Sequence, residues 1–252
     1  MKKRIDQLLV EKGLADTRSK AQALVMAGLV FVATKRIDKS SATFTDDVAI
    51  EVKGKDHPYV SRGGVKLAAA LSYFNIKPEG RTCLDVGAST GGFTDVLLRA
   101  GAKKIYAVDV GHNQLAYSLR ENPAVVVMEK TNARTLDASL IPESPDIVVC
   151  DASFISLRTV LPAALNLAKP SAWLVALIKP QFEVGKDLVG KGGIVRDHEL
   201  HTKVCKEIEA WLRDEMKWTI IGVIESPITG AEGNKEFLIG AQKSAVSHAA
   251  EA

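Results

Sequence analysis

Two lysines and two carboxylates stand beside predicted strand ends, where an enzyme built on a parallel sheet carries its chemistry. Asp151 and Lys179 each directly follow an apolar, strand-like run, and Glu236 begins the last such run. Lys66 lies on the helix that leads into the first strand. The crevice outside the carboxyl ends of parallel strands is the usual ligand site of such sheets. Ionisable groups gathered there are candidates for catalytic residues.

Each of these four residues also has an ordinary structural explanation. A solvated helix position accounts for Lys66, and a helix cap accounts for Asp151. A surface ion pair would explain Lys179 together with Glu236. Their joint placement around one crevice favours the catalytic interpretation.

A glycine-rich loop beside this crevice predicts a cofactor site. It runs from Asp85 to Phe93, with glycines at 87, 91 and 92, and leads into a helix. Glycines let the backbone turn tightly and approach a ligand, and the helix start offers unpaired N–H groups. The spacing matches neither the dinucleotide pattern G-x-G-x-x-G nor the phosphate-binding pattern G-x-x-x-x-G-K-[ST]. A simple turn capped by Asp85 is the alternative.

Asp109 supports a nucleoside ligand. It follows the second strand, 24 residues after Asp85, close to the spacing of the acid that hydrogen-bonds a ribose in related α/β domains. We therefore expect a ligand with a ribose but no pyrophosphate, and an ammonium group near Asp85. S-adenosylmethionine combines these features. The predicted cofactor-binding residues are Asp85, Gly87, Ser89, Thr90, Gly91, Gly92, Phe93, Asp109 and Asp151.

Alternating strands and helices must position these residues. Runs such as Ile147–Cys150 are apolar on both sides, which is typical of a parallel sheet covered by helices on both faces. The short connection 226–235 predicts an antiparallel last strand. The fold class is therefore α/β and doubly wound. The expected strands are 82–86, 105–109, 125–128, 147–150, 173–178, 218–224 and 236–239, with helices at 93–99, 114–119, 157–167 and 199–213.

The N-terminal segment is basic and has a different pattern. Residues 1–40 hold nine Lys or Arg against four Asp or Glu, a balance of +5, and the rest of the chain sums to −2. This balance suggests a polyanion-binding appendage, although surface lysines usually mark only a solvated face. We expect a helix ending at Gly13, a second helix capped by Asp16 or Thr17 and ending at Gly28, and strands at 29–33 and 48–52.

The predicted organisation is a small α+β domain at 1–52, a linker at 53–60, a catalytic domain at 61–243 and a tail at 244–252. The longest apolar run, 172–178, is far shorter than the roughly 18 residues that suggest a membrane span. We expect no signal peptide and a cytoplasmic protein. Cys83, Cys150 and Cys205 form no C-x-x-C pair, so neither a disulfide framework nor a metal site is predicted.

Five motifs resemble the TlyA family of ribosomal RNA 2′-O-methyltransferases, whose members are often called hemolysin-like and whose catalytic domain is similar to FtsJ. The matching stretches are 59–67, 85–94, 151–157, 178–183 and 226–238. Residues 3–52 resemble the αL-type RNA-binding domain of some ribosomal proteins and pseudouridine synthases. The resemblance implies a Rossmann-like class I methyltransferase fold, S-adenosylmethionine as cofactor and ribosomal RNA or a ribosomal subunit as partner.

The resemblance also implies a Lys-Asp-Lys-Glu catalytic tetrad of Lys66, Asp151, Lys179 and Glu236. A ribose hydroxyl is a poor nucleophile, so transfer needs a base or a field that stabilises the developing oxyanion. Lys179 is the candidate for this role. An ammonium group on Lys66 would favour the neutral form of Lys179, and the two carboxylates would orient the lysines and the substrate hydroxyl. Cytidine is the implied base. The implied RNA-binding residues are Lys2, Lys3, Arg4, Arg18, Lys20, Lys35, Arg36 and Arg62.

Other methyl acceptors fit the sequence less well. Exocyclic amino-group enzymes carry an Asn/Asp-Pro-Pro-aromatic segment after the fourth strand, where this chain has Asp-Ala-Ser-Phe from Asp151. Base-carbon enzymes need a cysteine nucleophile, and Cys150 is expected to point into the core. Two alternatives to an active enzyme remain: a catalytically silent RNA-binding ribosome factor and, as the family's other name suggests, a pore-forming hemolysin.

Overall fold

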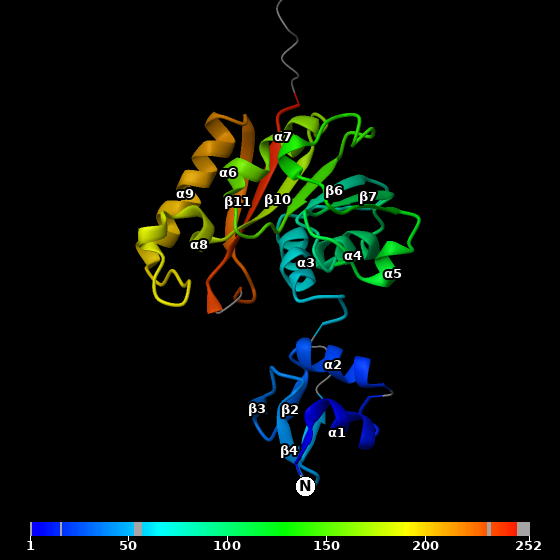
Figure 1. Ribbon diagram of the computed structural model, residues 1–252. Coiled ribbons are helices and arrows are strands. Elements are labelled where there is room, and N and C mark those ends of the chain that lie inside the picture. The colour runs from blue at the N-terminus through cyan, green and yellow to red at the C-terminus, as the bar shows by residue number, and fades with distance from the viewer. Residues whose placement is uncertain (1, 16, 53–56, 231–232, 246–252) are drawn as a thin grey trace, which may run out of the picture. The chain divides into compact units, whose positions relative to one another are not determined.

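The computed structural model describes residues 2–15, 17–52, 57–230 and 233–245 (Figure 1). The chain divides into two compact units, residues 1–58 and 59–252. Half of the predicted linker 53–60, most of the predicted tail 244–252 and one predicted helix cap, Asp16, lie outside the described residues.

The smaller unit combines two helices with short antiparallel strands. Its second helix is capped by the Thr17 hydroxyl, which accepts the backbone N–H of Lys20 at 3.2 Å. Ile5, Leu9 and Val30 are among the buried apolar residues that hold the helices against the strands. The elements are β1 (Lys2–Arg4), α1 (Ile5–Glu11), α2 (Arg18–Met26), β2 (Val30–Val32), β3 (Lys35–Arg36), β4 (Thr43–Thr45) and β5 (Ile50–Val52). β1 pairs with β4, and β2 lies between β3 and β5.

The larger unit is built on a seven-stranded sheet in the order β11-β12-β10-β9-β6-β7-β8. Strands β6 to β10 are parallel, and β12 is antiparallel to both of its neighbours, which confirms the predicted fold class. The chain proceeds from β6 to one side through β7 and β8 and then returns to the other side through β9 and β10. This reversal places the topological switch point, where such sheets bind ligands, between β6 and β9.

The strands of the sheet are β6 (Thr82–Val86), β7 (Lys104–Val108), β8 (Val125–Met128), β9 (Ile147–Cys150), β10 (Trp173–Ile178), β11 (Trp218–Glu225) and β12 (Phe237–Lys243). The helices are α3 (Gly63–Tyr73), α4 (Gly92–Arg99), α5 (Tyr117–Arg120), α6 (Leu157–Val160), α7 (Pro162–Leu167), α8 (Pro180–Glu183) and α9 (His198–Asp214), with single 3₁₀ turns at Ala133–Thr135 and Lys186–Leu188.

Helices cover both faces of the sheet because successive strand residues point to opposite sides. On β9, Val148 belongs to the core shared with α6, α7 and α9, whereas Val149 belongs to the core shared with α3 and α4. Each fully buried Val, Leu or Ile side chain contributes roughly 1.5–3 kcal/mol to stability. The two cores therefore fix the strand ends at which the site is built.

Several element bounds differ from the sequence prediction. The helix expected at 157–167 is two helices, because Pro162 has no N–H to continue the first one. The helix expected at 114–119 is reduced to Tyr117–Arg120, and the last strand begins at Phe237, so Glu236 precedes it. Among the described helices, none is long and apolar enough to cross a membrane.

Candidate active site

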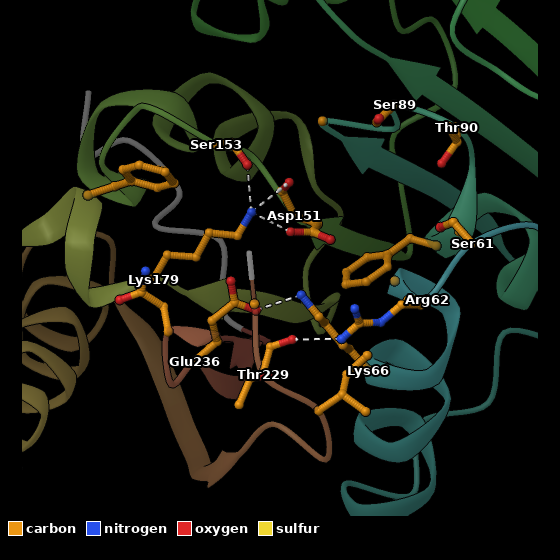
Figure 2. A pocket seen from close by; sticks show the side chains of 18 of the residues that line it. Ser61, Arg62, Lys66, Ser89, Thr90, Asp151, Ser153, Lys179, Thr229 and Glu236 are labelled. Atoms are coloured by element: carbon orange, nitrogen blue, oxygen red, sulfur yellow. Dashed lines mark hydrogen bonds and ion pairs between the residues drawn. The ribbon is translucent and has the colours of Figure 1, made fainter. Parts of the chain in front are cut away.

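A cavity of about 470 Å³ lies where the segments after β6, β9 and β10 meet the start of α3 and the segment before β12 (Figure 2). The structure brings all four predicted catalytic residues to its wall. It also places there part of the predicted cofactor loop and one predicted RNA-binding residue, Arg62. The predicted residues that line the cavity are Arg62, Lys66, Gly87, Ser89, Thr90, Gly92, Phe93, Asp151, Lys179 and Glu236.

Lys66 and Glu236 form a buried ion pair on one wall of the cavity. The Lys66 ammonium donates to Glu236 Oε2 at 2.5 Å, across 170 residues of sequence. Gly230 has no side chain, and a Cβ there would overlap the Glu236 carboxylate. Glycine at position 230 therefore lets the backbone there approach the Glu236 carboxylate closely. Removing one partner of a buried ion pair leaves an uncompensated charge, at a cost of roughly 3–5 kcal/mol.

Lys179 and Asp151 form a second ion pair on the facing wall. Lys179 Nζ lies 2.6 Å from Asp151 Oδ1, and it donates to Ser153 Oγ at 2.8 Å and to the Asp151 carbonyl at 3.4 Å. Only 8% of the Lys179 side chain is exposed. The third contact is long, so one ammonium N–H is weakly held. That N–H can turn toward an oxygen atom of a substrate in the cavity.

The glycine loop lies directly against the loop that carries Asp151. Gly87 has a left-handed φ of 81°, and a Cβ there would lie 2.9 Å from both N and Cα of Ala152. Only glycine permits this approach, which brings the loops after β6 and β9 together. Asp109, after β7, accepts the backbone N–H of Ser89 at 2.8 Å and that of Gly111 at 2.7 Å. Asp109 thus supports the cofactor loop from the side.

Asp85 lies beneath the loop, outside the residues that line the cavity. It is fully buried, and its Oδ2 accepts the Thr94 hydroxyl at 2.6 Å. Burial raises the pKa of this carboxyl to about 7. Its Oδ1 has no hydrogen-bond partner among the described residues. A buried, unpaired carboxylate oxygen below a glycine loop fits a ligand that carries an ammonium group.

Two further predicted cofactor residues, Gly91 and Asp109, also lie outside the cavity wall. Gly91 has a φ of 94°, and a Cβ there would lie 2.8 Å from Leu115 Cδ1 and would overlap Leu119. Gly91 therefore permits close packing behind the loop, while Ser89 and Thr90 face the cavity.

Cys150 belongs to the buried core, and burial raises the pKa of its thiol to about 12, so it is unsuited to be a nucleophile.

Sequence reasoning missed several residues of the site, among them Ser153, Phe154 and Asn234. Ser153 accepts from Lys179, and Phe154 next to it has a φ of 65° and is 89% exposed on the cavity rim. The Phe154 ring lies 5.1 Å from that of Phe182. Asn234 is buried and joins two loops, because its side chain accepts from Val195 N and donates to Gly193 O, both at 3.0 Å. The motif around Glu236 was the available signal for Asn234.

The predicted RNA-binding residues of the smaller unit lie on β1, α2 and β3. Two of them are tied to a buried acid: Arg4 and Arg18 lie 2.9 and 3.1 Å from Asp6 Oδ2. The bond from Arg4 holds the pKa of Asp6 well below its usual range. Lys3 pairs with Glu11 at 2.8 Å. The remaining predicted residues of this unit are Lys2, Lys20, Lys35 and Arg36. Arg62 belongs to the larger unit and donates to the Thr229 carbonyl at 3.1 Å.

A seven-stranded sheet in this order, with an antiparallel β12, a glycine loop after β6 and a cavity at the switch point, is typical of the class I methyltransferases that use S-adenosylmethionine. Residues 59–243 match the FtsJ-like methyltransferase family, and residues 3–47 match the S4 domain. The chain belongs to the TlyA family of FtsJ-like methyltransferases. The predicted family, fold and cofactor are thereby confirmed.

Two curated relatives and one solved structure resemble most of the chain. The 16S/23S rRNA (cytidine-2′-O)-methyltransferase TlyA of Mycobacterium tuberculosis is 46% identical over 237 residues, covering 94% of this chain and 88% of that protein. Hemolysin A of Brachyspira hyodysenteriae is 42% identical over 240 residues, covering 93% and 98%. The structure of a Streptococcus thermophilus protein described as a candidate hemolysin has a TM-score of 0.76 at 43% identity, covering 96% and 89%.

Proposed function

We propose that this protein transfers the methyl group of S-adenosylmethionine to a ribose 2′-hydroxyl of ribosomal RNA, with cytidine as the target nucleotide. The observation that carries the proposal is the convergence of two lysine–carboxylate pairs and the glycine loop on one cavity. The name of the Mycobacterium tuberculosis relative supports the ribose target and the base. A ribosomal substrate implies a cytoplasmic site of action.

The cofactor supplies an electrophilic methyl group on a sulfonium centre. Ser89, Thr90 and the backbone around Gly87 would hold it at the cavity wall. Asp109 would accept a hydrogen bond from the ribose of the cofactor, and the buried Asp85 carboxylate would attract the ammonium group of the cofactor. These assignments follow from the chemistry of the donors and acceptors, because an ammonium is most stable beside a carboxylate that lacks another partner.

Lys179 and Asp151 would act on the substrate hydroxyl. The weakly held N–H of Lys179 would donate to the 2′ oxygen and stabilise the negative charge that develops there. The Asp151 carboxylate would take the proton that the 2′-hydroxyl loses on methylation, because Lys179, as an ammonium group, has no lone pair to accept it. Ser153 holds Lys179 in place at 2.8 Å. Orientation of the hydroxyl by this pair supplies much of the rate.

Lys66 and Glu236 would fix the electrostatics of the opposite wall. Their contact is short and buried, so the Lys66 ammonium keeps its position rather than moving into solvent. A fixed positive charge near the reacting oxygen stabilises an oxyanion more than a mobile one, since no reorganisation is needed. We therefore assign this pair to charge stabilisation and to the placement of α3 beside the segment before β12.

Phe154 would receive the target or a neighbouring base. A phenylalanine that is 89% exposed at a cavity rim, with a left-handed backbone, exposes a large apolar surface at the cost of backbone strain. Enzymes that modify RNA take single-stranded or extruded nucleotides and stack their bases on aromatic rings. Residues 1–52, the basic S4-containing segment, would bind phosphates, while residues 61–243 would carry out the transfer.

The test of the tetrad is the variant Lys179→Ala, assayed with ribosomal subunits and S-adenosylmethionine. We expect the turnover to fall by at least about 10²–10³-fold, as when one oxyanion donor is lost. The Kd for S-adenosylhomocysteine should stay within about twofold, because Lys179 is assigned to the substrate hydroxyl. Lys169→Ala is the matched control, since Lys169 pairs with Asp146 just before the amino end of β10. Near-normal turnover of Lys179→Ala would refute the tetrad.

A further inference from the structure

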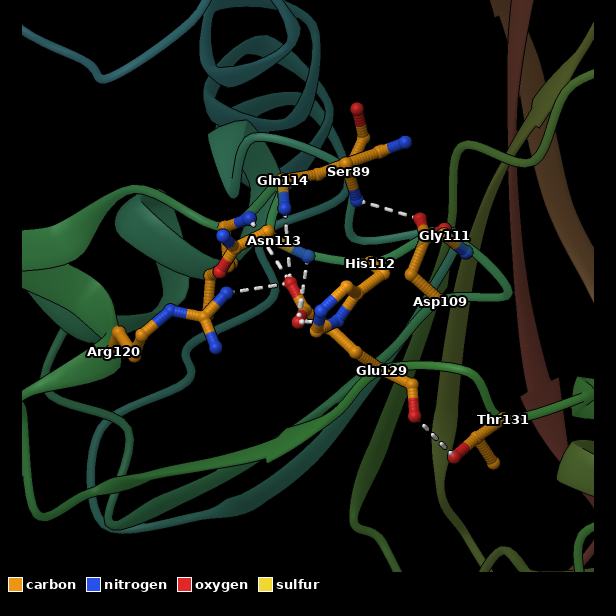
Figure 3. Close-up of polar contacts among 10 residues, drawn as sticks. Ser89, Asp109, Gly111, His112, Asn113, Gln114, Arg120, Glu129 and Thr131 are labelled. Carbon is orange, nitrogen blue, oxygen red and sulfur yellow. Dashed lines mark hydrogen bonds and ion pairs between the residues drawn. The ribbon is translucent and has the colours of Figure 1, made fainter.

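The carboxylate of Glu129, just after β8, is enclosed by the segment that follows Asp109 (Figure 3). Its Oε1 accepts the backbone N–H of Gln114 at 3.0 Å, that of Leu115 at 3.4 Å and the Arg120 guanidinium at 2.6 Å. Its Oε2 accepts the N–H of Asn113 at 2.9 Å. One side chain thus satisfies donors along a whole turn of the chain.

This arrangement is an anion-binding nest filled by an internal carboxylate. Asn113 has a left-handed φ of 59°, which turns the successive N–H groups of residues 113–115 toward one point. The Arg120 bond first, and the Asn113 N–H next, lower the pKa of Glu129 to about 2. His112 lies against the same group, with Nδ1 3.4 Å from Oε2. The carboxylate therefore stays ionised near neutral pH and keeps the nest closed.

The nest is coupled to Asp109 through the backbone. Lys130 N donates to Gly111 O at 3.0 Å, and Thr131 N donates to Asp109 O at 2.9 Å. Gly111 N in turn donates to Asp109 Oδ1 at 2.7 Å. Gly111, in the segment that encloses Glu129, and Thr131, two residues after Glu129, are therefore both hydrogen-bonded to Asp109, the acid assigned to the cofactor ribose.

The same segment supports the glycine loop from behind. Ala116 N donates to Thr90 O at 3.1 Å. The side chains of Leu115 and Leu119 fill the space that a side chain at Gly91 would need. Segment 111–120 therefore contacts both Asp109 and the glycine loop of the proposed nucleoside site. Glu129 stabilises the turn in this segment by accepting its backbone N–H groups.

We infer that Glu129 is a positioning residue for the cofactor: it holds segment 111–120 against Asp109 and the glycine loop, and so sets the affinity for S-adenosylmethionine. Glu129 does not line the cavity and acts through these neighbours. The inference rests on the proposed roles of Asp109 and the glycine loop in binding the cofactor.

The test compares full-length Glu129→Ala and Glu129→Gln with the wild type by calorimetric titration of S-adenosylhomocysteine. We expect the Kd to rise about tenfold or more for Glu129→Ala, because several hydrogen bonds to a charged group are lost. Glu129→Gln keeps the shape and one accepting oxygen but turns an NH₂ group toward the nest, so its Kd should rise by a smaller factor. The KM for the cofactor should rise in parallel, while kcat at saturating cofactor and the KM for RNA stay within about twofold.

Glu143→Ala is the control for loss of an ion-paired glutamate. Glu143 pairs with Lys104 and accepts from Thr82 Oγ1 at 3.3 Å, at the amino ends of β6 and β7. The Kd of the Glu143→Ala variant for S-adenosylhomocysteine should equal that of the wild type. Lowered melting temperatures with an unchanged Kd in both Glu129 variants would make Glu129 merely structural and overturn the inference. If the wild type binds S-adenosylhomocysteine but methylates no RNA, the substrate proposal fails while the Kd comparison still decides the role of Glu129.

Discussion

Replacing Asp85 by Asn should separate the stability of the protein from its affinity for the cofactor. Asp85 is fully buried, and one of its oxygens has no partner among the described residues. Burying a charge without a partner is costly, so burial raises the pKa of the Asp85 carboxyl to about 7. Asn has nearly the same shape and cannot ionise. Its carbonyl oxygen can still accept from the Thr94 hydroxyl.

The sign and size of the effect follow from proton linkage. Between pH 3.8 and about 7 the folded protein holds a proton on Asp85 that the unfolded chain has released, so rising pH favours unfolding. For this shift, the free energy of unfolding falls by roughly 2.5 kcal/mol between pH 5 and pH 8. Asp85→Asn lacks this contribution. Any fixed cost of burying its NH₂ group is the same at both pH values and cancels from the comparison.

Urea unfolding at pH 5 and pH 8, followed by tryptophan fluorescence, measures this difference. The three tryptophans, Trp173, Trp211 and Trp218, all belong to the larger unit, so the signal reports the unit that contains Asp85. We expect the variant to gain about 2–3 kcal/mol relative to the wild type on going from pH 5 to pH 8. Its Kd for S-adenosylmethionine at pH 8 should rise at least about tenfold through loss of the ammonium partner. A stability difference that is equal at both pH values would contradict a raised pKa of Asp85 in the folded protein.

Two further predictions concern RNA. Phe154→Ala should raise the KM for RNA by about 5–100-fold through loss of base stacking, with an unchanged Kd for S-adenosylhomocysteine; Tyr73→Ala, an exposed aromatic away from the cavity, is the control, and an unchanged KM contradicts the stacking role. Lys35→Ala with Arg36→Ala should weaken RNA binding and reduce the slope of log K against log salt by about two. Equal affinity at low salt, measured beside Lys203→Ala, would remove β3 from the footprint.

The strand-end residues were the most predictable part of the site. In a parallel sheet the positions after neighbouring strands must meet at one edge, so the placement of Asp151 and Lys179 followed from apolar runs alone. The partners with which the lysines form ion pairs could not be predicted in this way. Lys66 reaches Glu236 because α3 and the segment before β12 pack together, and no local pattern encodes a contact across 170 residues.

The cofactor loop shows where a motif does not define roles. The glycine spacing predicted a ligand-binding turn, but it could not distinguish Gly87, which lets two loops touch, from Gly91, which makes room for leucines of a distant segment. Glu129 carried no signal at all, since its partners are backbone N–H groups whose direction depends on the turn at Asn113. Tertiary contact decides such roles.

The small strands of the N-terminal unit were missed for a related reason. β1 and β3 consist of Lys and Arg alone, and β4 has a single apolar residue, Phe44, between two threonines. None is long enough to show the alternation over four or more residues that predicts a strand. The basic residues on β1 and α2 are also less independent than charge counting suggests. Arg4 and Arg18 hold the buried Asp6, so their removal would destabilise the unit as well as weaken RNA binding.

Methyl transfer to a ribose of cytidine is tested most directly by nucleoside analysis of ribosomal RNA after incubation with the purified protein and labelled S-adenosylmethionine. Ribosomal subunits from cells that lack the gene would provide unmodified substrate. We expect label in 2′-O-methylcytidine, and none with Lys179→Ala. Label on a base, or no label from a protein that binds S-adenosylhomocysteine, would contradict it.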